Sequence, residues 1–154
     1  MRIITLGLLF MITPVLMGAG SESASTPSVG KHEKYYNKGV DAQNQKDYVE
    51  AVKWYGRALE EKPDYADAHN NLGFSLRSIG REYLHRAGQA YDDALQADAN
   101  HAEALEYQGE LYLWTGQITK ARGNLDRLKA LNSPEAQELE KQLKRILDEA
   151  QKLL

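Results

Sequence analysis

The residues that most often carry out chemistry in proteins are few and scattered in this chain of 154 residues. The chain has no cysteine, which excludes disulfides, thiolate metal ligands and a catalytic thiol. No two of its histidines form an H-E-x-x-H or comparable ligand pair; they are His32, His69, His85 and His101. Glycine-rich phosphate loops, dinucleotide fingerprints and G-x-S-x-G motifs do not occur in the sequence. We therefore predict no catalysis, no metal and no cofactor.

Charge does not indicate nucleic acid as a partner either. The formal net charge is −3, and lysine and arginine never gather into a basic run. Hydrophobic residues make up 42% and charged residues 27% of the chain, which is typical of a globular protein. The function must therefore be sought in the elements that carry the polar and aromatic side chains.

The first twenty residues, "MRIITLGLLFMITPVLMGAG", differ from the rest of the chain. One positive charge at Arg2 precedes an apolar run, and small residues follow it. This layout predicts a secretory signal peptide over residues 1–20, cleaved within about residues 18–24, and hence a periplasmic or secreted protein. An uncleaved membrane anchor is the main alternative, because about 18 apolar residues can just span a bilayer; a buried core helix is the weakest one. The serine-rich residues 21–31 predict a flexible linker.

A repeat of about 34 residues runs from residue 32 to residue 133. Glycine recurs at intervals of 34 and 36 residues, in Gly39, Gly73 and Gly109. Alanine recurs at intervals of 36 and 34 residues, in Ala51, Ala87 and Ala121. Each period holds two helical patterns, so the sequence predicts a helical solenoid. The expected helix pairs are 32–45 with 48–61, 65–79 with 82–97, and 101–115 with 118–131.

The repeated small residues predict close contact between helices. Glycine inside a helix costs about 1 kcal/mol relative to alanine, so its recurrence at one position needs a packing reason. We expect the alanines to lie opposite the glycines, with Tyr55 and Tyr91 filling the wider gap beside them. Gly80 and Gly116 fall where the first helix of a pair should end, and we expect both to form left-handed caps.

The repeat resembles the tetratricopeptide repeat (TPR) family, in particular its small exported bacterial members. The first repeat fits the family pattern best, through Gly39, Ala51, Tyr55, Ala58 and Pro63. The resemblance implies an all-α fold, a right-handed superhelical solenoid of three helix pairs followed by a C-terminal capping helix. The expected units are 32–65, 66–101 and 102–133, with the capping helix at 134–154.

The apolar residues of the last segment alternate at spacings of three and four. They are Ala136, Leu139, Leu143, Ile146, Ala150 and Leu153. Such a stripe suits a helix that covers the open end of a solenoid, which repeat arrays need. The alternative is a coiled-coil seam, through which the chain would associate with itself. Both interpretations stay open at this point.

The resemblance also implies a binding groove, because the first helix of each TPR pair lines a concave face that holds a segment of a partner protein. Carried over by position, the lining residues are Tyr36, Val40, Gln43 and Asn44 in the first repeat, Asn70, Phe74 and Arg77 in the second, and Glu103, Glu106, Glu110, Leu113 and Trp114 in the third. Chaperone-binding members hold a carboxylate with a clamp of basic and amide side chains. Here only Asn71 fits that clamp, since its other places hold Tyr36, Val40, Glu103 and Tyr107.

Glu103, Glu106 and Glu110 share one helical face, next to Trp114. We expect them to form a negative strip that suits a partner with Lys or Arg beside an aromatic or aliphatic anchor; a merely solvated acidic face is the alternative. The sequence thus predicts a non-catalytic protein–protein interaction adaptor of the bacterial cell envelope. The alternative is a structural scaffold that self-associates through the solenoid end or the C-terminal helix.

Overall fold

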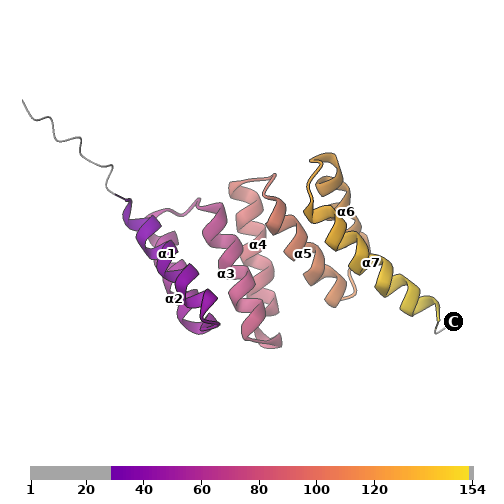
Figure 1. Cartoon of the computed structure of the whole chain (residues 1–154), viewed down its shortest axis with the longest axis horizontal. Helices are drawn as coiled ribbons and strands as arrows, with labels where there is room; N and C mark the ends of the chain where they lie inside the picture. The colour runs from indigo at the N-terminus through magenta and orange to yellow at the C-terminus, as the bar shows by residue number, and fades with distance from the viewer. Residues whose placement is uncertain (1–28, 153–154) are drawn as a thin grey trace, which may run out of the picture.

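A computed structural model describes residues 29–152 of the chain, and the regular structure in this span is entirely helical. The α-helices are α1 (Lys31–Asn44), α2 (Tyr48–Glu61), α3 (Ala66–Ile79), α4 (Leu84–Ala97), α5 (Ala102–Trp114), α6 (Ile118–Ala130) and α7 (Glu135–Gln151). A short 3₁₀ helix, η1 (Arg81–Tyr83), precedes α4. The helices stack in chain order along one axis, from α1 and α2 at one end to α7 at the other (Figure 1). Each expected solenoid helix is present, with its ends displaced by two residues at most.

The predicted signal peptide at residues 1–20 and most of the predicted linker lie outside the described residues. Between residues 29 and 152, no helix combines the length and the apolar character needed to cross a membrane.

Local signals explain where several helices begin and end. The Asp47 carboxylate caps α2 by accepting a hydrogen bond from the backbone N–H of Glu50 at 3.0 Å. Gly116 follows α5 with φ of 76°, the left-handed conformation that glycine adopts without strain. The same expectation for Gly80 is wrong, because this residue is extended with φ of 159° and leads into η1.

The recurring glycines of α1, α3 and α5 do make close contacts, but side-chain rings and methyls come nearest to them rather than the expected alanines. A Cβ atom added to Gly39 would lie 2.5 Å from the Tyr55 ring, and one added to Gly73 would lie 2.7 Å from the Tyr91 ring. Each tyrosine therefore packs directly onto the glycine of its own repeat, not in a separate gap. Ala51, Ala87 and Ala121 are nevertheless completely buried.

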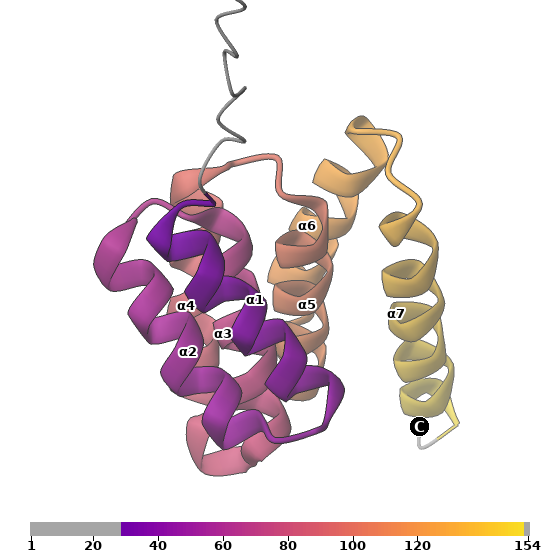
Figure 2. The same cartoon turned by 60° about the vertical axis from the view of Figure 1, so that its left-hand side comes forward.

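In the third repeat, α7 provides the group that packs on the glycine. A Cβ atom on Gly109 would lie 2.5 Å from a methyl carbon of Leu139, a residue that is fully buried. Leu139 and Leu143 join Leu105 and Leu125 in one core cluster. As Figure 2 shows, α7 stands at the end of the stack beside α5 and α6, so it covers the last helix pair.

Candidate functional site

Side chains from α1, α3 and α5, the first helices of the three pairs, meet in one continuous surface, which we call the A-helix face. Asn71 on α3 donates a hydrogen bond from Nδ2 to the Tyr36 hydroxyl on α1 at 3.0 Å. Phe74 on α3 packs on Tyr107 of α5, with ring centroids 5.5 Å apart. The three helices that were expected to line the groove therefore share a face.

Tyr36 is built into the wall of this face at its N-terminal side. Its ring lies between those of Tyr55 and Tyr65, with centroid distances of 5.7 and 5.0 Å. Burial, helped by the nearby Asp67 carboxylate, raises the pKa of Tyr36 to about 12, so the hydroxyl stays neutral at physiological pH. Tyr36 thus contributes no charge to the face.

The other residues predicted on α1 and at the start of α3 differ in how far they reach the surface. Val40 is half-buried against a core cluster formed by Ala42, Ala51 and Tyr55, and Asn44 is exposed. Gln43 is half-buried and tied down, because its Oε1 accepts from the Tyr55 hydroxyl at 3.1 Å and from the Ser75 hydroxyl at 3.2 Å. Asn70 is only 1% exposed, so it lies beneath the face and does not line it as predicted.

Arg77 lies at the centre of an aromatic box. Its guanidinium carbon is 5.5 Å from the Phe74 ring centroid, 5.1 Å from that of Tyr107 and 5.0 Å from that of Trp114. Its Nη1 also donates a hydrogen bond to the Glu110 carboxylate, and the two side chains are only 9% and 13% exposed. The carboxylate balances the positive charge of the guanidinium, and the rings stabilise it through cation–π contacts. Arg77 and Glu110 therefore support the face and are not free charges on it.

Trp114 is the large apolar side chain that this face leaves most open. It is 58% exposed, although its ring covers Arg77. Beside it lies a hollow of about 640 Å³, whose walls are Arg77, Gly80, Arg81, Leu84, Trp114 and Thr115. A half-open tryptophan next to a hollow of this size can receive an apolar side chain from a partner.

The expected open strip of three glutamates is wrong, because α7 packs beside α5 and covers part of it. Glu103 is exposed, whereas Glu106 is half-buried. Burial, together with the neighbouring carboxylates, raises the pKa of Glu106 to about 7; these carboxylates are Glu110, Glu135, Glu138 and Glu103. Of the three glutamates, Glu103 is therefore the one that presents an open carboxylate, since Glu110 is ion-paired with Arg77.

Two further contacts show how α7 closes this part of the face. Gln142 of α7 donates a hydrogen bond from its side-chain amide to the Glu110 carboxylate. Leu113, which was predicted to line the groove, is only 4% exposed and belongs to the core cluster that α7 completes. The prediction for Leu113 is wrong because α7 occupies the position at which a fourth repeat would add its first helix.

Comparison with known proteins agrees with this geometry. A family model described as TPR repeat matches residues 44–80. The TPR2B domain of yeast Sti1, in a complex with pHsp70, superposes with a TM-score of 0.69 at 18% identity, covering 77% of this chain and 97% of that one. The chain has the TPR fold. PcrH, in complex with the chaperone binding region of PopD, is a second neighbour in structure, with a TM-score of 0.67 at 19% identity and coverage of 77% of this chain and 92% of that one.

Curated relatives match a shorter stretch of sequence. The photosystem I assembly protein Ycf3 of Synechococcus sp. (strain CC9605) is 34% identical over 95 residues, which are 60% of this chain and 54% of that protein. The chain thus spans about half the length of the curated relatives it matches.

The residues at the positions of the carboxylate clamp are not arranged to hold a carboxylate. At the clamp positions the Asn71 amide is already engaged by Tyr36, and Glu103 adds a negative charge nearby. A partner's terminal carboxylate would meet no free base among these side chains.

Sequence reasoning missed several residues of the face. Tyr107, which the sequence places only at a clamp position, forms one wall of the aromatic box, and Tyr48 at the start of α2 packs edge-on against Phe74, with ring centroids 6.2 Å apart. A signal for the central pair was present, because Arg77 and Glu110 are 33 residues apart, close to one repeat. Residues one repeat apart on successive first helices lie side by side in a solenoid, so such offsets identify cross-helix partners.

Proposed function

We propose that this chain is a non-catalytic adaptor that binds a segment of a partner protein on the A-helix face. The observation that carries the proposal is the half-open Trp114 ring beside the hollow of about 640 Å³. Structural neighbours support it, since Sti1 and PcrH are each described in complex with part of another protein. The supporting groups around Trp114 are already hydrogen-bonded or ion-paired, so binding does not require the face to rearrange.

The geometry narrows the chemistry of the partner segment. An aromatic or aliphatic side chain would enter the hollow beside Trp114 and provide most of the affinity, because desolvated apolar anchors dominate interface energies. A Lys or Arg elsewhere in the segment would reach Glu103, the exposed carboxylate of the predicted strip. That charge would act mainly on the rate of association and on its salt dependence.

The binding proposal is tested by site-specific photocrosslinking in bacterial cells that produce the full chain. A photoreactive amino acid at Asn44, which is exposed on α1 and in register with Tyr36 and Val40, should form a discrete adduct with a partner. Trp114→Ala should remove most of this adduct, because it deletes the anchor contact.

The matched control is Trp54→Ala, which truncates the other tryptophan. Trp54 stacks on Tyr35 at 5.8 Å and is flanked by Lys38 and Arg57, away from the aromatic box. Thermal unfolding of both variants verifies that they fold. Adducts that survive Trp114→Ala, or that disappear equally with Trp54→Ala, would contradict the proposed face.

We further propose that the adaptor works outside the cytoplasm, in the bacterial cell envelope. The support is the arrangement of Arg2, apolar run and small residues in positions 1–20. Fusing residues 1–30 to a reporter that is active only after export should give activity, and Arg2→Glu with a charged residue in the apolar run should abolish it. Mass spectrometry of the mature N-terminus then distinguishes cleavage near residues 18–24 from an uncleaved anchor. A silent wild-type fusion would contradict export.

A further inference from the structure

The apolar seam of α7 continues beyond the part that the other helices within residues 29–152 bury well. Its first members are well buried, with Ala136 7%, Leu139 0% and Leu143 7% exposed. Further along the helix Ile146 is only half-buried and Ala150 is exposed. In Figure 1 the second half of α7 extends past the stacked helices toward the C-terminus. The N-terminal half of the helix thus completes the core, whereas in the C-terminal half Ile146 still packs at the edge of that core and the residues after it are exposed up to residue 152.

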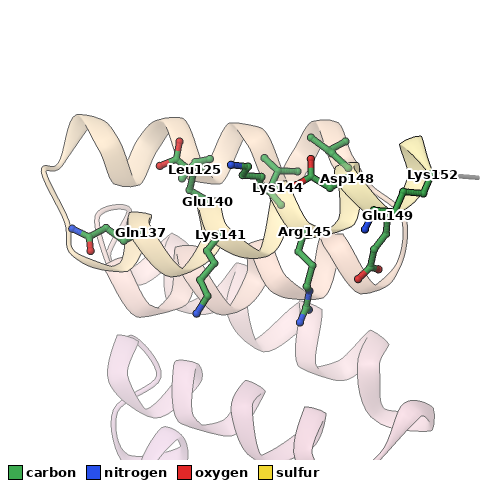
Figure 3. Close-up of a pocket in the computed structure, with 11 residues that line it drawn as sticks. Leu125, Gln137, Glu140, Lys141, Lys144, Arg145, Asp148, Glu149 and Lys152 are labelled. Atoms are coloured by element: carbon green, nitrogen blue, oxygen red, sulfur yellow. The ribbon is translucent and has the colours of Figure 1, made fainter.

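Next to this seam, α7 carries a stripe of side chains that borders a hollow of about 940 Å³. Glu140, Lys144 and Asp148 project to the same side of α7, whereas Lys141 and Arg145 project to the opposite side (Figure 3). Leu147, which also borders the hollow, is 38% exposed. The stripe therefore combines an exposed leucine with charges of both signs, spaced one helical turn apart.

The charges of this stripe complement a second copy of the stripe running in the opposite direction. With the two Leu147 side chains meeting near a two-fold axis, Lys144 of each copy would lie opposite Asp148 of the other. Neither of these residues has an ion-pair partner elsewhere in residues 29–152. A parallel arrangement would instead set Lys144 against Lys144. The pattern therefore selects the antiparallel, closed pairing.

We propose that the C-terminal half of α7 is a homodimer interface, in which two copies pair antiparallel through Leu147, Lys144 and Asp148. This interface is distinct from the proposed adaptor function, and it leaves the A-helix face accessible. Gln142, which contacts Glu110 on that face, is about half a turn around α7 from Lys144. One dimer would accordingly present two partner-binding faces, each with its own Trp114.

The proposal is tested with charge-reversal variants of the full chain, studied by sedimentation velocity over a range of concentrations. Wild type should show a concentration-dependent monomer–dimer equilibrium. Lys144→Glu and Asp148→Lys should each weaken the dimer about tenfold or more, because each replaces two attractive pairs by two like-charge pairs. Raised salt should reduce the difference between wild type and each variant.

Mixing the two variants distinguishes a contact between two copies from a change of charge pairing within a single α7 helix. A heterodimer of Lys144→Glu with Asp148→Lys has opposite charges at both contacts, so an equimolar mixture should dimerise more tightly than either variant alone. Arg122→Glu, a charge reversal at an exposed position of α6, is the control and should leave the equilibrium unchanged. A wild type that stays monomeric up to about 100 µM, or a mixture that stays monomeric, would overturn the proposal.

Discussion

At the level of single residues, the pair formed by Arg77 and Glu110 determines what the A-helix face can offer a partner. Its side chains are nine-tenths and almost nine-tenths buried, and three aromatic rings surround the guanidinium. The free energy lost when both charges leave water offsets much of the attraction within such a pair. The loss of one partner nevertheless leaves the other charge buried and without compensation. Glu110 thus holds Arg77 in place, against which the Trp114 ring packs.

Replacing the carboxylate tests this reading of the pair. Glu110→Gln should lower the free energy of unfolding by about 2–3 kcal/mol, because Arg77 stays charged and buried without an anion beside it. Urea unfolding followed by tryptophan fluorescence measures the change. Glu103→Gln, an exposed member of the same predicted strip, should change stability by less than about 0.5 kcal/mol. Equal effects of the two substitutions would show that Glu110 is as solvated as Glu103.

The sequence predicted which residues face the groove better than it predicted their burial and their ion pairs. Position in the repeat sufficed to bring Tyr36, Phe74 and Trp114 into one face. It could not reveal that Arg77 and Glu110 neutralise each other, since that depends on side-chain reach across two helices. It also could not reveal that Asn70 lies beneath the surface, because a polar residue at a surface register gives no sign of its burial.

At the level of elements, the contact between α5 and α7 places carboxylates against carboxylates. Glu106 of α5 is half-buried near Glu135 and Glu138 of α7, and its pKa is raised from 4.5 to about 7. Between these two pH values the folded state holds a proton that the unfolded state has released. The stability contributed by Glu106 is therefore fully present below about pH 4.5 and is lost as the pH rises through about 7.

This linkage can be isolated by comparing wild type with Glu106→Gln between pH 5 and pH 8. Gln removes the titration, so the variant should gain about 1–2 kcal/mol relative to wild type over this range, a value reduced to allow for solvent screening at a half-buried site. Chemical unfolding at each pH gives the two curves. Glu60→Gln, at an exposed place on α2, should leave the slope as in wild type. Parallel curves for wild type and Glu106→Gln would contradict the linkage.

The helices themselves followed from the sequence, because the 34-residue period, the Asp47 cap and the glycine after α5 are local signals. The side of α5 that α7 covers did not follow from it. The alternation from Ala136 to Leu153 serves equally for capping or for self-association, and a pattern along one helix does not state which neighbour it meets. Because the neighbour of α7 could not be predicted, Glu106 and Leu113 were expected at an open surface.

At the level of the whole molecule, the stack is an array in which each helix pair contacts only its neighbours. The buried residues accordingly divide into clusters, one around Ala51 and Tyr55, one around Leu76 and Tyr91, and one that joins α5, α6 and α7. The stability of such an array is approximately a sum over units and their interfaces. A defect at the end should therefore unfold the end first and leave the opposite end protected.

Leu139 offers the sharpest test of this behaviour. It is completely buried, and its methyl carbons occupy the space above Gly109, so Leu139→Ala should leave a cavity and cost about 2–4 kcal/mol. Hydrogen–deuterium exchange should show lost protection in α5, α6 and α7, while α1 and α2 retain most of theirs. Leu147→Ala, on the same helix but 38% exposed, should leave exchange in α5 and α6 unchanged. If Leu139→Ala instead accelerated exchange uniformly from α1 to α7, the chain would be one cooperative unit, and α7 would stabilise the A-helix face of every repeat rather than the last one alone.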